Sequence, residues 1–448
     1  MSETPHPGIR YAELSHVGMR RSNNQDAFSV MISKSADRIE TRGHLFVVAD
    51  GMGAHAAGEL ASQIASEQIP KHYFGATHQT PENAVVEAVH VANEAIFQRG
   101  RSNPEFHNMG TTASTLALLP GAAYIAHVGD SRVYRLRGQT LHQMTFDHSL
   151  VWEMHESGQV HSDSPLGRSI PKNVITRSLG PAADVLVDLE GPLDLRPGDQ
   201  FLLCSDGLTG EVTDEELAVL MGCVEPDALV HVLVDLANLR GGPDNITVVV
   251  AEIEGDQLTH PAPGSTAPTS ISSETMRSRA LLATMAVCWL GAIGFTSAAL
   301  MGEGRFIGSA IVAFVLGAIA AGVWAMGWFK AGTSSHSSRK RGHGGNDSGN
   351  AREHARGKAP YRTFDAAPTL EVHDRVWGMV EELRQTAEHK NWMLDWDDVD
   401  QWQRQAEQAK TQGNLRDAIG LQSRAFSASM LQLRKHQDES ASDTVIDL

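Results

Sequence analysis

Short apolar runs separated by turn residues recur through the first 256 residues of the chain. They include "HLFVVAD" (44–50), "STLALLPG" (114–121), "AAYIAHVGD" (122–130), "QFLLCSDG" (200–207) and "NITVVVAEI" (245–253). Runs of four to eight residues rich in Val, Ile and Leu are typical of buried strands. Apolar residues at helical spacing lie between them, as in "PENAVVEAVHVANEAIF" (81–97), which starts on a proline, a common first helical residue. Adjacent strands with helices grouped in pairs predict an α+β sandwich and not an alternating βαβ fold.

Two longer apolar stretches, residues 280–300 and 306–329, contain no charged residue. Each is long enough to cross about 30 Å of hydrocarbon as a helix. Because only "MGEGR" separates them, they predict an antiparallel transmembrane hairpin over 277–330, and the basic residues on both flanks place those flanks in the cytoplasm. The expected location is therefore the cell membrane, with two spanning helices and with the N-terminal domain and the C-terminal tail cytoplasmic.

Two linkers are predicted on either side of this hairpin. Residues 257–276 are rich in Pro, Ser and Thr, which is typical of a linker. Residues 331–368 are rich in Gly, Ser and Arg and contain almost nothing to bury, so this segment is expected to be disordered. Its basic residues suit contact with anionic lipid headgroups, and they equally suit a solvated tether.

Helical periodicity returns in the tail, residues 369–448. Val372, Val376 and Val380 lie on one helical stripe. The stretch "AEQAKTQGNLRDAIGLQSRAF" resembles one tetratricopeptide helix pair, although a single copy is weak evidence. The tail also holds half of the eight tryptophans of the chain. It is predicted to be an α-helical domain that either binds a partner protein or packs without a further role.

Composition narrows the possible functions. The net charge of −17 disfavours an extended basic surface, so no nucleic-acid partner is expected. The three cysteines, at positions 204, 223 and 288, are too few and too scattered for a disulfide framework or a zinc site. The N-terminal stretch "MSETPHPGIRYAEL" lacks the apolar core of a cleaved secretory signal.

Four of the predicted strands carry an aspartate at one tip. "FVVADG" ends on Asp50, "FLLCSDG" on Asp206 and "YIAHVGD" on Asp130, and "NITVVV" begins directly after Asp244. An aspartate at a single tip is usually a turn cap. Four aspartates on the most apolar strands are not expected by coincidence. Strands that run in suitable directions would bring all four carboxylates to one edge of the sandwich.

Such a cluster would need cations. Clustered carboxylates repel one another and take up protons unless positive charge compensates them. Ligands of this oxygen-only kind suit Mg²⁺ or Mn²⁺, and no Cys or His cluster competes for a softer metal. Two such ions about 3.5–4 Å apart would hold a bridging water, lower its pKa and present hydroxide to a phosphorus centre. Gly51 and Gly207, which follow two of the aspartates, would let a backbone carbonyl approach an ion.

Eight segments, taken in order, resemble the metal-dependent serine/threonine phosphatases of the protein phosphatase 2C family, bacterial branch. The segments are "RSNNQDAF", "VVADGMGAH", "MGTTAS", "AHVGDSRVYRL", "DHSLV", "ITRSLG", "PGDQFLLCSDGLTGEV" and "GGPDNITVVV", and they cover nearly all of residues 10–253. The resemblance implies a catalytic domain over residues 1–256. It also implies a β-sandwich of two antiparallel sheets flanked by helix pairs, in four αββα layers.

The resemblance further implies a site that holds two ions. Asp50 would bridge both of them, and the Gly51 carbonyl would bind one. Asp206 and Asp244 would bind the other ion. The metal would be Mn²⁺ or Mg²⁺.

Four more positions acquire implied roles. Asp26 would hold metal-bound water, and Asp130 would support a weaker third ion together with Asp206. Arg21 corresponds to the arginine that binds the substrate phosphate, for which a planar guanidinium is suited. His55 matches a histidine close to the substrate, either as the acid that protonates the leaving alkoxide or as a solvated loop residue.

The sequence departs from the family pattern in three places. Gln25 stands where many relatives have a glutamate, so one ion would depend more on water. Ala54 replaces a common glycine in the loop after Asp50. The segment 145–180 matches at its ends but is less regular in its middle, and in relatives this segment flanks the site and shapes substrate choice.

The sequence therefore predicts a metal-dependent serine/threonine phosphatase that uses direct attack of a metal-bridging hydroxide, without a phosphoenzyme. The expected partners are phosphoserine and phosphothreonine proteins, with serine/threonine kinases among them. The alternative is a non-catalytic sensor that binds phosphoproteins without cleaving them. Its signature would be the loss of a metal-ligating aspartate, and none is missing.

Overall fold

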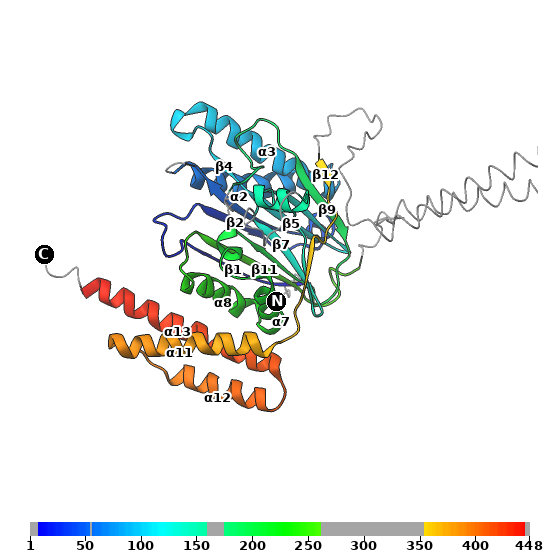
Figure 1. Ribbon diagram of the computed structural model, residues 1–448. Coiled ribbons are helices and arrows are strands. Elements are labelled where there is room, and N and C mark those ends of the chain that lie inside the picture. Colours follow the sequence, from blue (N-terminus) through cyan, green and yellow to red (C-terminus); the bar gives the residue numbers. More distant parts are fainter. Residues whose placement is uncertain (1–7, 54–55, 159–173, 261–353, 444–448) are drawn as a thin grey trace, which may run out of the picture. The chain divides into compact units, whose positions relative to one another are not determined.

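The computed structural model describes residues 8–53, 56–158, 174–260 and 354–443. Residues 1–263 and 351–448 form one compact unit, and residues 264–350 form a second unit, which lies outside the described residues. The first unit contains two β-sheets with helices on their outer faces (Figure 1). The predicted α+β fold with two packed sheets is confirmed for this unit.

One sheet has six strands, and all of its neighbours are antiparallel. Its strands, in spatial order, are β1 (Ile9–His16), β11 (Ile246–Ile253), β10 (Gln200–Cys204), β7 (Arg132–Arg137), β8 (Thr140–Gln143) and β13 (Arg362–Asp365). The hairpin between β7 and β8 turns at Gly138, whose φ of 60° favours glycine.

The other sheet has seven strands, and only its pair β12–β9 is parallel. Its spatial order is β12 (His354–Arg356), β9 (Val187–Leu193), β6 (Ala122–Val128), β5 (Ala113–Leu119), β3 (His44–Met52) and β2 (Asp26–Met31), with β4 (Gly110–Thr111) paired to β3.

Strand β3 shows why its sequence is apolar without interruption. Leu45, Val47 and Ala49 point to the core under the helices, whereas Phe46 and Val48 point to the core between the sheets. Successive side chains of a strand face opposite sides, so a strand that is covered on both faces needs apolar residues at every position.

Two pairs of long helices form the outer layers. Residues of α2 (Ala57–Gly75) and α3 (Pro81–Ser102) share an apolar core with the seven-stranded sheet. Residues of α7 (Asp214–Cys223) and α8 (Pro226–Leu239) share another core with the six-stranded sheet. Thr80 caps α3 and Pro81 opens it, so the helix start predicted from the sequence is confirmed. Shorter helices are α1 (Ala36–Arg42), η1 (Pro104–Phe106), α4 (Leu150–Glu156) and α6 (Asp206–Thr209).

The tail folds into α11 (Leu370–Lys390), α12 (Asp397–Thr411) and α13 (Leu415–Asp443). The predicted valine stripe is buried, and it belongs to the same apolar cluster as α7 and α8. Phe426 of α13 is also in this cluster and is 1% exposed. The tail helices and the six-stranded sheet therefore share one core.

Residues 354–368 differ from the expected disordered segment over 331–368. They form β12 and β13 and an extended connection to α11, with β12 added to β9 and β13 added to β8. The reason is backbone pairing, because an edge strand offers unpaired N–H and C=O groups to any segment that reaches it. The remaining residues of that segment lie outside the described ranges.

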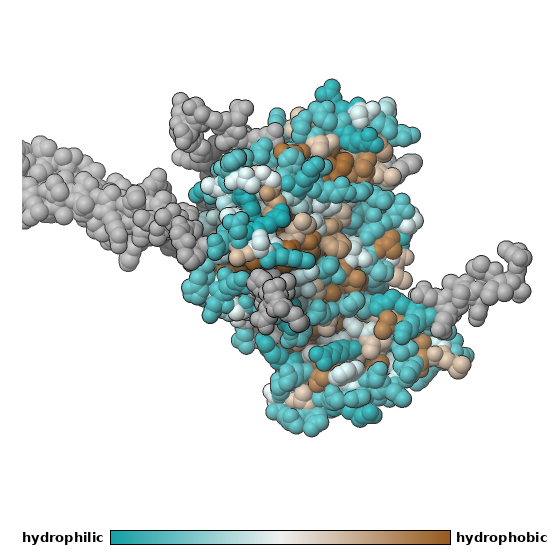
Figure 2. All heavy atoms as spheres, turned by 180° about the vertical axis from the view of Figure 1, so that it is seen from behind, coloured by the Kyte–Doolittle hydropathy of each residue, from teal (hydrophilic) through white to brown (hydrophobic). Residues whose placement is uncertain are grey.

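The expected cell-membrane location, with two spanning helices, is contradicted. Within the described ranges, no helix is both long enough and apolar enough to cross a bilayer. The long helices α11 and α13 carry charged residues along their length, which would be costly in hydrocarbon. The stretches 280–300 and 306–329, on which the expectation rested, lie outside the described residues. One face of the described residues is mainly hydrophilic, with apolar residues in interrupted patches (Figure 2).

Candidate active site

Asp26 and Asp50 lie directly opposite each other on neighbouring strands. Asp26 begins β2, Asp50 lies near the end of β3, and the antiparallel register pairs the two residues. Directly opposed residues in a sheet have Cβ atoms about 4.5–5.5 Å apart. The fold therefore holds two carboxylates in close opposition, which costs stability unless protons or cations compensate the charge.

The six-stranded sheet supplies two more carboxylates. Asp206 begins α6 directly after β10, and Asp244 lies two residues before β11. Because β10 and β11 are antiparallel neighbours, the end of one strand lies beside the start of the other. Asp130 follows β6 in the turn to β7.

Asp50 interacts electrostatically with the four other carboxylates. Burial raises its pKa well above the ordinary value, and the charges of Asp26, Asp206, Asp130 and Asp244 raise it further, in that order. The predicted gathering of strand-tip aspartates is thus present in the structure, including Asp26 from the edge strand β2.

The pKa values of the neighbours are raised as well. Burial raises the pKa of Asp26 to about 7, against opposing hydrogen bonds from Ser205 and Thr247. Burial, followed by the charge of Asp206, raises the pKa of Asp130 to about 8. Burial, followed by the charge of Asp244, raises the pKa of Asp206, and its interaction with Asp50 opposes this rise.

The donor set fits hard divalent cations. Oδ1 of Asp26 and Oδ1 of Asp130 are buried and have no hydrogen-bond partner among the described residues. Carboxylate oxygens of this kind are ligands that Mg²⁺ and Mn²⁺ prefer. No three described Asp, Glu, His or Cys side chains are arranged closely enough to hold one ion as they stand, so an ion would have to draw the carboxylates together.

Arg21 lies beside this cluster. Its Nη2 donates to Oδ2 of Asp244 at 2.7 Å, and its side chain is 46% exposed. The sequence placed Arg21 and Asp244 in one site, and the structure brings the two side chains into contact. His55 and Ala54 lie outside the described residues.

The two site glycines are required by close backbone packing. A Cβ atom on Gly51 would lie 2.1 Å from the Gly58 carbonyl oxygen, and one on Gly207 would lie 2.0 Å from that of Asn245. The sequence attributed both glycines to the approach of a carbonyl to an ion. Ion binding by the Gly51 carbonyl stays a prediction, whereas the steric need for glycine is evident.

Hydroxyl and amide residues that the sequence did not single out hold the cluster in place. Ser205 Oγ donates to Oδ2 of Asp26 at 2.7 Å, and Thr112 Oγ1 accepts from the Asp50 backbone N–H at 2.9 Å. Asn245 Nδ2 donates to the carbonyl oxygens of Val17 and Asn23, and its Oδ1 accepts from the Gln25 N–H. Their only signal was their position next to a predicted aspartate or within a matching segment.

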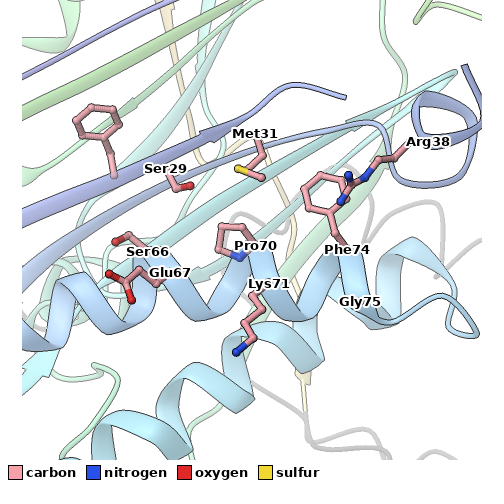
Figure 3. A pocket seen from close by; sticks show the side chains of 10 residues that line it. Ser29, Met31, Arg38, Ser66, Glu67, Pro70, Lys71, Phe74 and Gly75 are labelled. Carbon is pink, nitrogen blue, oxygen red and sulfur yellow. The ribbon is translucent and has the colours of Figure 1, made fainter. Parts of the chain in front are cut away.

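A cavity of about 740 Å³ lies elsewhere, between β2 and α2 (Figure 3). The side chains of Ser29 and Met31 face those of Pro70 and Phe74 across it, and the Arg38 guanidinium lies over the Phe74 ring at 4.4 Å. None of the five aspartates lines this cavity. The acidic cluster, and not the cavity, therefore defines the candidate site.

Fold and site together define a class: an α+β sandwich protein with a carboxylate centre suited to hard divalent cations. A sequence profile described as Protein phosphatase 2C matches residues 15–236. Protein phosphatase PhpP of Streptococcus pneumoniae serotype 2 is 34% identical over 244 residues, which is 54% of this chain and 96% of PhpP. Serine/threonine protein phosphatase PstP of Mycobacterium tuberculosis is 34% identical over 250 residues, 55% of this chain and 45% of PstP.

Among solved structures, the catalytic domain of serine/threonine protein phosphatase PstP in complex with two manganese ions is 33% identical. The match covers 55% of this chain and 99% of that domain, with a TM-score of 0.46. From the profile and the curated relatives, the chain belongs to the protein phosphatase 2C family. It is an enzyme, a protein-serine/threonine phosphatase.

Proposed function

We propose that this phosphatase hydrolyses phosphoserine and phosphothreonine in proteins with two divalent cations, Mn²⁺ or Mg²⁺, held by the acidic cluster. The observation that carries the proposal is the convergence of five aspartates on Asp50. When bound, such a pair of ions lowers the pKa of a water molecule and neutralises charge on the phosphoryl group.

Each aspartate has a proposed role. Asp50, which interacts with all four others, is the bridging ligand, and Asp206 and Asp244 are ligands from the other sheet. Ser205 donates a hydrogen bond to Oδ2 of Asp26. Oδ1 of Asp26 has no partner among the described residues and is therefore the atom that can bind a water molecule of the site. Asp130, whose Oδ1 is likewise buried without a partner, is the ligand for a weaker third ion.

Arg21 is the proposed phosphate-binding residue. Its guanidinium is half exposed and already contacts a carboxylate of the cluster, so a phosphate that enters the site would meet it. A planar guanidinium can donate two parallel hydrogen bonds to phosphate oxygens. The roles of the Gly51 carbonyl and of His55 remain predictions from the family resemblance.

We also propose how the chain is divided. The phosphatase domain would comprise residues 8–260 together with the strands at 354–366, and the tail from 369 would be a helical domain packed on it. Phosphorylated serine/threonine kinases are proposed substrates, because they carry phosphoserine and phosphothreonine. No observation on the described residues favours a non-catalytic sensor, since each aspartate predicted as a metal ligand is present.

The test uses the full-length protein. With Mn²⁺ and a phosphothreonine peptide, we expect phosphate release that a chelator abolishes. In Asp50→Asn, we expect the rate to fall by roughly 100-fold or more, because loss of even an indirect metal contact costs 10–100-fold. Calorimetric titration with Mn²⁺ should show weaker binding in the same variant.

Asp194→Asn is the matched control. Asp194 is 64% exposed and pairs with Arg137 away from the cluster, so the rate and the Mn²⁺ binding should stay at the wild-type level. Phosphate release that does not depend on a divalent metal would refute the proposal, as would full activity in Asp50→Asn.

A further inference from the structure

A short stretch near the tail, residues 354–366, joins the edges of both sheets. We call it the bridging segment. Its strand β12 pairs with β9 of the seven-stranded sheet, and its strand β13 pairs with β8 of the six-stranded sheet. Figure 1 shows it, in yellow and orange, passing from β12 toward α11. The bridging segment therefore has backbone contacts with both sheets.

The bridging segment also satisfies a buried carboxylate of the sandwich. Glu190 in β9 is 4% exposed, and it accepts hydrogen bonds from Tyr361 Oη at 2.6 Å and from the Ala359 N–H at 3.0 Å. A Cβ atom on Gly357 would lie 1.4 Å from Oε1 of the same glutamate. A buried carboxylate without hydrogen-bond partners is costly, so the bridging segment stabilises Glu190 in β9.

Arg362, the residue after Tyr361, contacts Trp152 of α4. Its guanidinium lies over the ring of Trp152 at 4.0 Å from the ring centre, and its Nη1 lies 3.6 Å from Oδ2 of Asp214. The Phe146 ring lies edge-on to both Trp152 and Tyr361, with ring centres 5.6 Å apart in each case. Trp152 is 5% exposed, and Arg362, which lies far from it in the sequence, covers one face of its ring.

The start of α4 is in turn tied to the candidate site. His148, one residue before the Ser149 cap of α4, donates its N–H to the Gly129 carbonyl at 2.8 Å. His148 Nδ1 accepts from the Gly129 N–H at 2.9 Å. Gly129 immediately precedes Asp130, so this pair of hydrogen bonds fixes the turn that carries a proposed metal ligand.

Arg132 gives a second connection between α4 and the site. It binds both carboxylate oxygens of Asp147, at 3.0 and 2.7 Å, and its guanidinium lies 5.8 Å from the Trp152 ring centre. Arg132 opens β7, two residues after Asp130. The ring of Trp152 is therefore contacted by one arginine from the turn and one from the bridging segment.

We propose that Arg362 and Tyr361 are positioning residues of the phosphatase, which hold α4 and the adjoining Asp130 turn in the arrangement that accepts a phosphoprotein. The proposal rests on the proposed function for its kinetic part. α4 begins at Leu150, two residues after His148, whose hydrogen bonds to Gly129 hold the turn that carries Asp130. Contacts there should matter more for a peptide than for a small phosphate ester, because a peptide covers more of the surface around the site.

The test compares five full-length proteins: wild type, Arg362→Ala, Arg362→Lys, Tyr361→Phe and Arg375→Ala. Arg375 of α11 is the matched control, because it is also 41% exposed and paired with a phosphatase carboxylate, but its ion pairs are with Glu216 and Glu371 and not with a residue of α4. Arg362 is 41% exposed, so its truncation should leave the fold intact. Two readouts are used: hydrogen exchange of the amides in 147–156, and steady-state kinetics.

For Arg362→Ala we expect faster amide exchange in α4 and a KM for a phosphothreonine peptide raised about five-fold, the size of a lost cation–π contact. The kcat for a small aryl phosphate should change less than about two-fold. Lysine keeps a cation over the ring, so Arg362→Lys should recover most of the peptide KM. Tyr361→Phe, which removes the hydrogen bond to Glu190, should change exchange and KM in the same direction as Arg362→Ala.

Identical exchange and identical kinetics in Arg362→Ala and Arg375→Ala would overturn the proposal. Altered exchange with unchanged peptide KM would also overturn it, because the contact would then only stabilise α4. If the wild-type protein releases no phosphate, the proposed function fails instead, and the exchange measurement still decides whether Arg362 holds α4.

Discussion

One side-chain amide, that of Asn245, holds the loop that carries Arg21. It donates to the carbonyls of Val17 and Asn23 and accepts from the Gln25 N–H, at 2.8–2.9 Å. In Asn245→Ala these three backbone groups lose their partner, so we expect a loss of about 1–3 kcal/mol in the free energy of unfolding. The KM for a phosphopeptide should also rise, because Arg21 is then held less firmly. Urea denaturation and steady-state kinetics measure the two effects.

Asn414→Ala provides the comparison for this variant. Asn414 is exposed; its side chain accepts a capping hydrogen bond from the Asp417 N–H at the start of α13 and donates one to Oδ2 of the same residue. Its loss should cost up to about 1 kcal/mol in stability and should leave KM unchanged. Equal KM values for wild type and Asn245→Ala would show that the loop does not need this amide.

Some residues of the site could be predicted from the sequence, and others could not. Asp50, Asp206 and Asp244 were predicted because each interrupts an apolar run, and the structure brings them together. Ser205 and Asn245 were not predicted, because hydroxyl and amide residues beside a turn are common and their partners depend on tertiary packing. The need for Gly207 was predicted, but for a different reason, since close backbone contacts are not visible in one chain segment.

At the level of elements, α7 connects the phosphatase to the tail through Glu216. Burial favours the neutral form of this carboxyl group, but hydrogen bonds from Arg240 and Arg375 outweigh it and lower the pKa to about 2. The pKa of the folded state is thus below the ordinary value. Glu216 therefore stabilises the fold above about pH 4.5, and this contribution is lost as the pH falls toward 2.

Glu216→Gln should reduce the dependence of stability on pH in this range. The free energy of unfolding, measured with urea at several values between pH 6 and pH 3, should fall less steeply than in wild type. Glu215→Gln changes the neighbouring exposed carboxyl and should retain the wild-type slope. A wild-type slope in Glu216→Gln would mean that its ion pairs with the two arginines contribute nothing to stability.

Long elements were predictable and short ones were not. The apolar run of β3 and the helical spacing of α3 identified these elements, because many positions repeat one pattern. Strands β12 and β13 have three and four residues in a polar region, so their sequence carries no periodic signal. They form because the edges of β9 and β8 are available, and an edge belongs to the whole fold.

For the whole molecule, the shared core predicts a single unfolding transition of the first unit. Phe426 of α13 is 1% exposed and lies in one apolar cluster with α7, α8 and the six-stranded sheet. Phe426→Ala should lower the free energy of unfolding by about 3–5 kcal/mol. Far-ultraviolet circular dichroism and phosphatase activity should be lost together along a urea gradient, in wild type and in the variant.

Leu431→Ala on the same helix separates burial from helix effects. Leu431 is 47% exposed, so its truncation should change stability by less than about 0.5 kcal/mol. If activity persisted at urea concentrations that had already unfolded the tail, the helical tail and the phosphatase would be independent folding units.

The packing of the tail on α7 and α8 has a practical consequence for producing the enzyme. The match with PhpP of S. pneumoniae covers 96% of PhpP but only 54% of this chain. The length of PhpP would therefore suggest that a short N-terminal fragment of this chain is enough for expression. A fragment that stops after β11 would remove α11, α12 and α13 from the apolar cluster that they share with α7 and α8. We expect such a fragment to self-associate and to bind hydrophobic dyes, and we expect compact relatives to carry polar residues on the faces of α7 and α8 that the tail covers here.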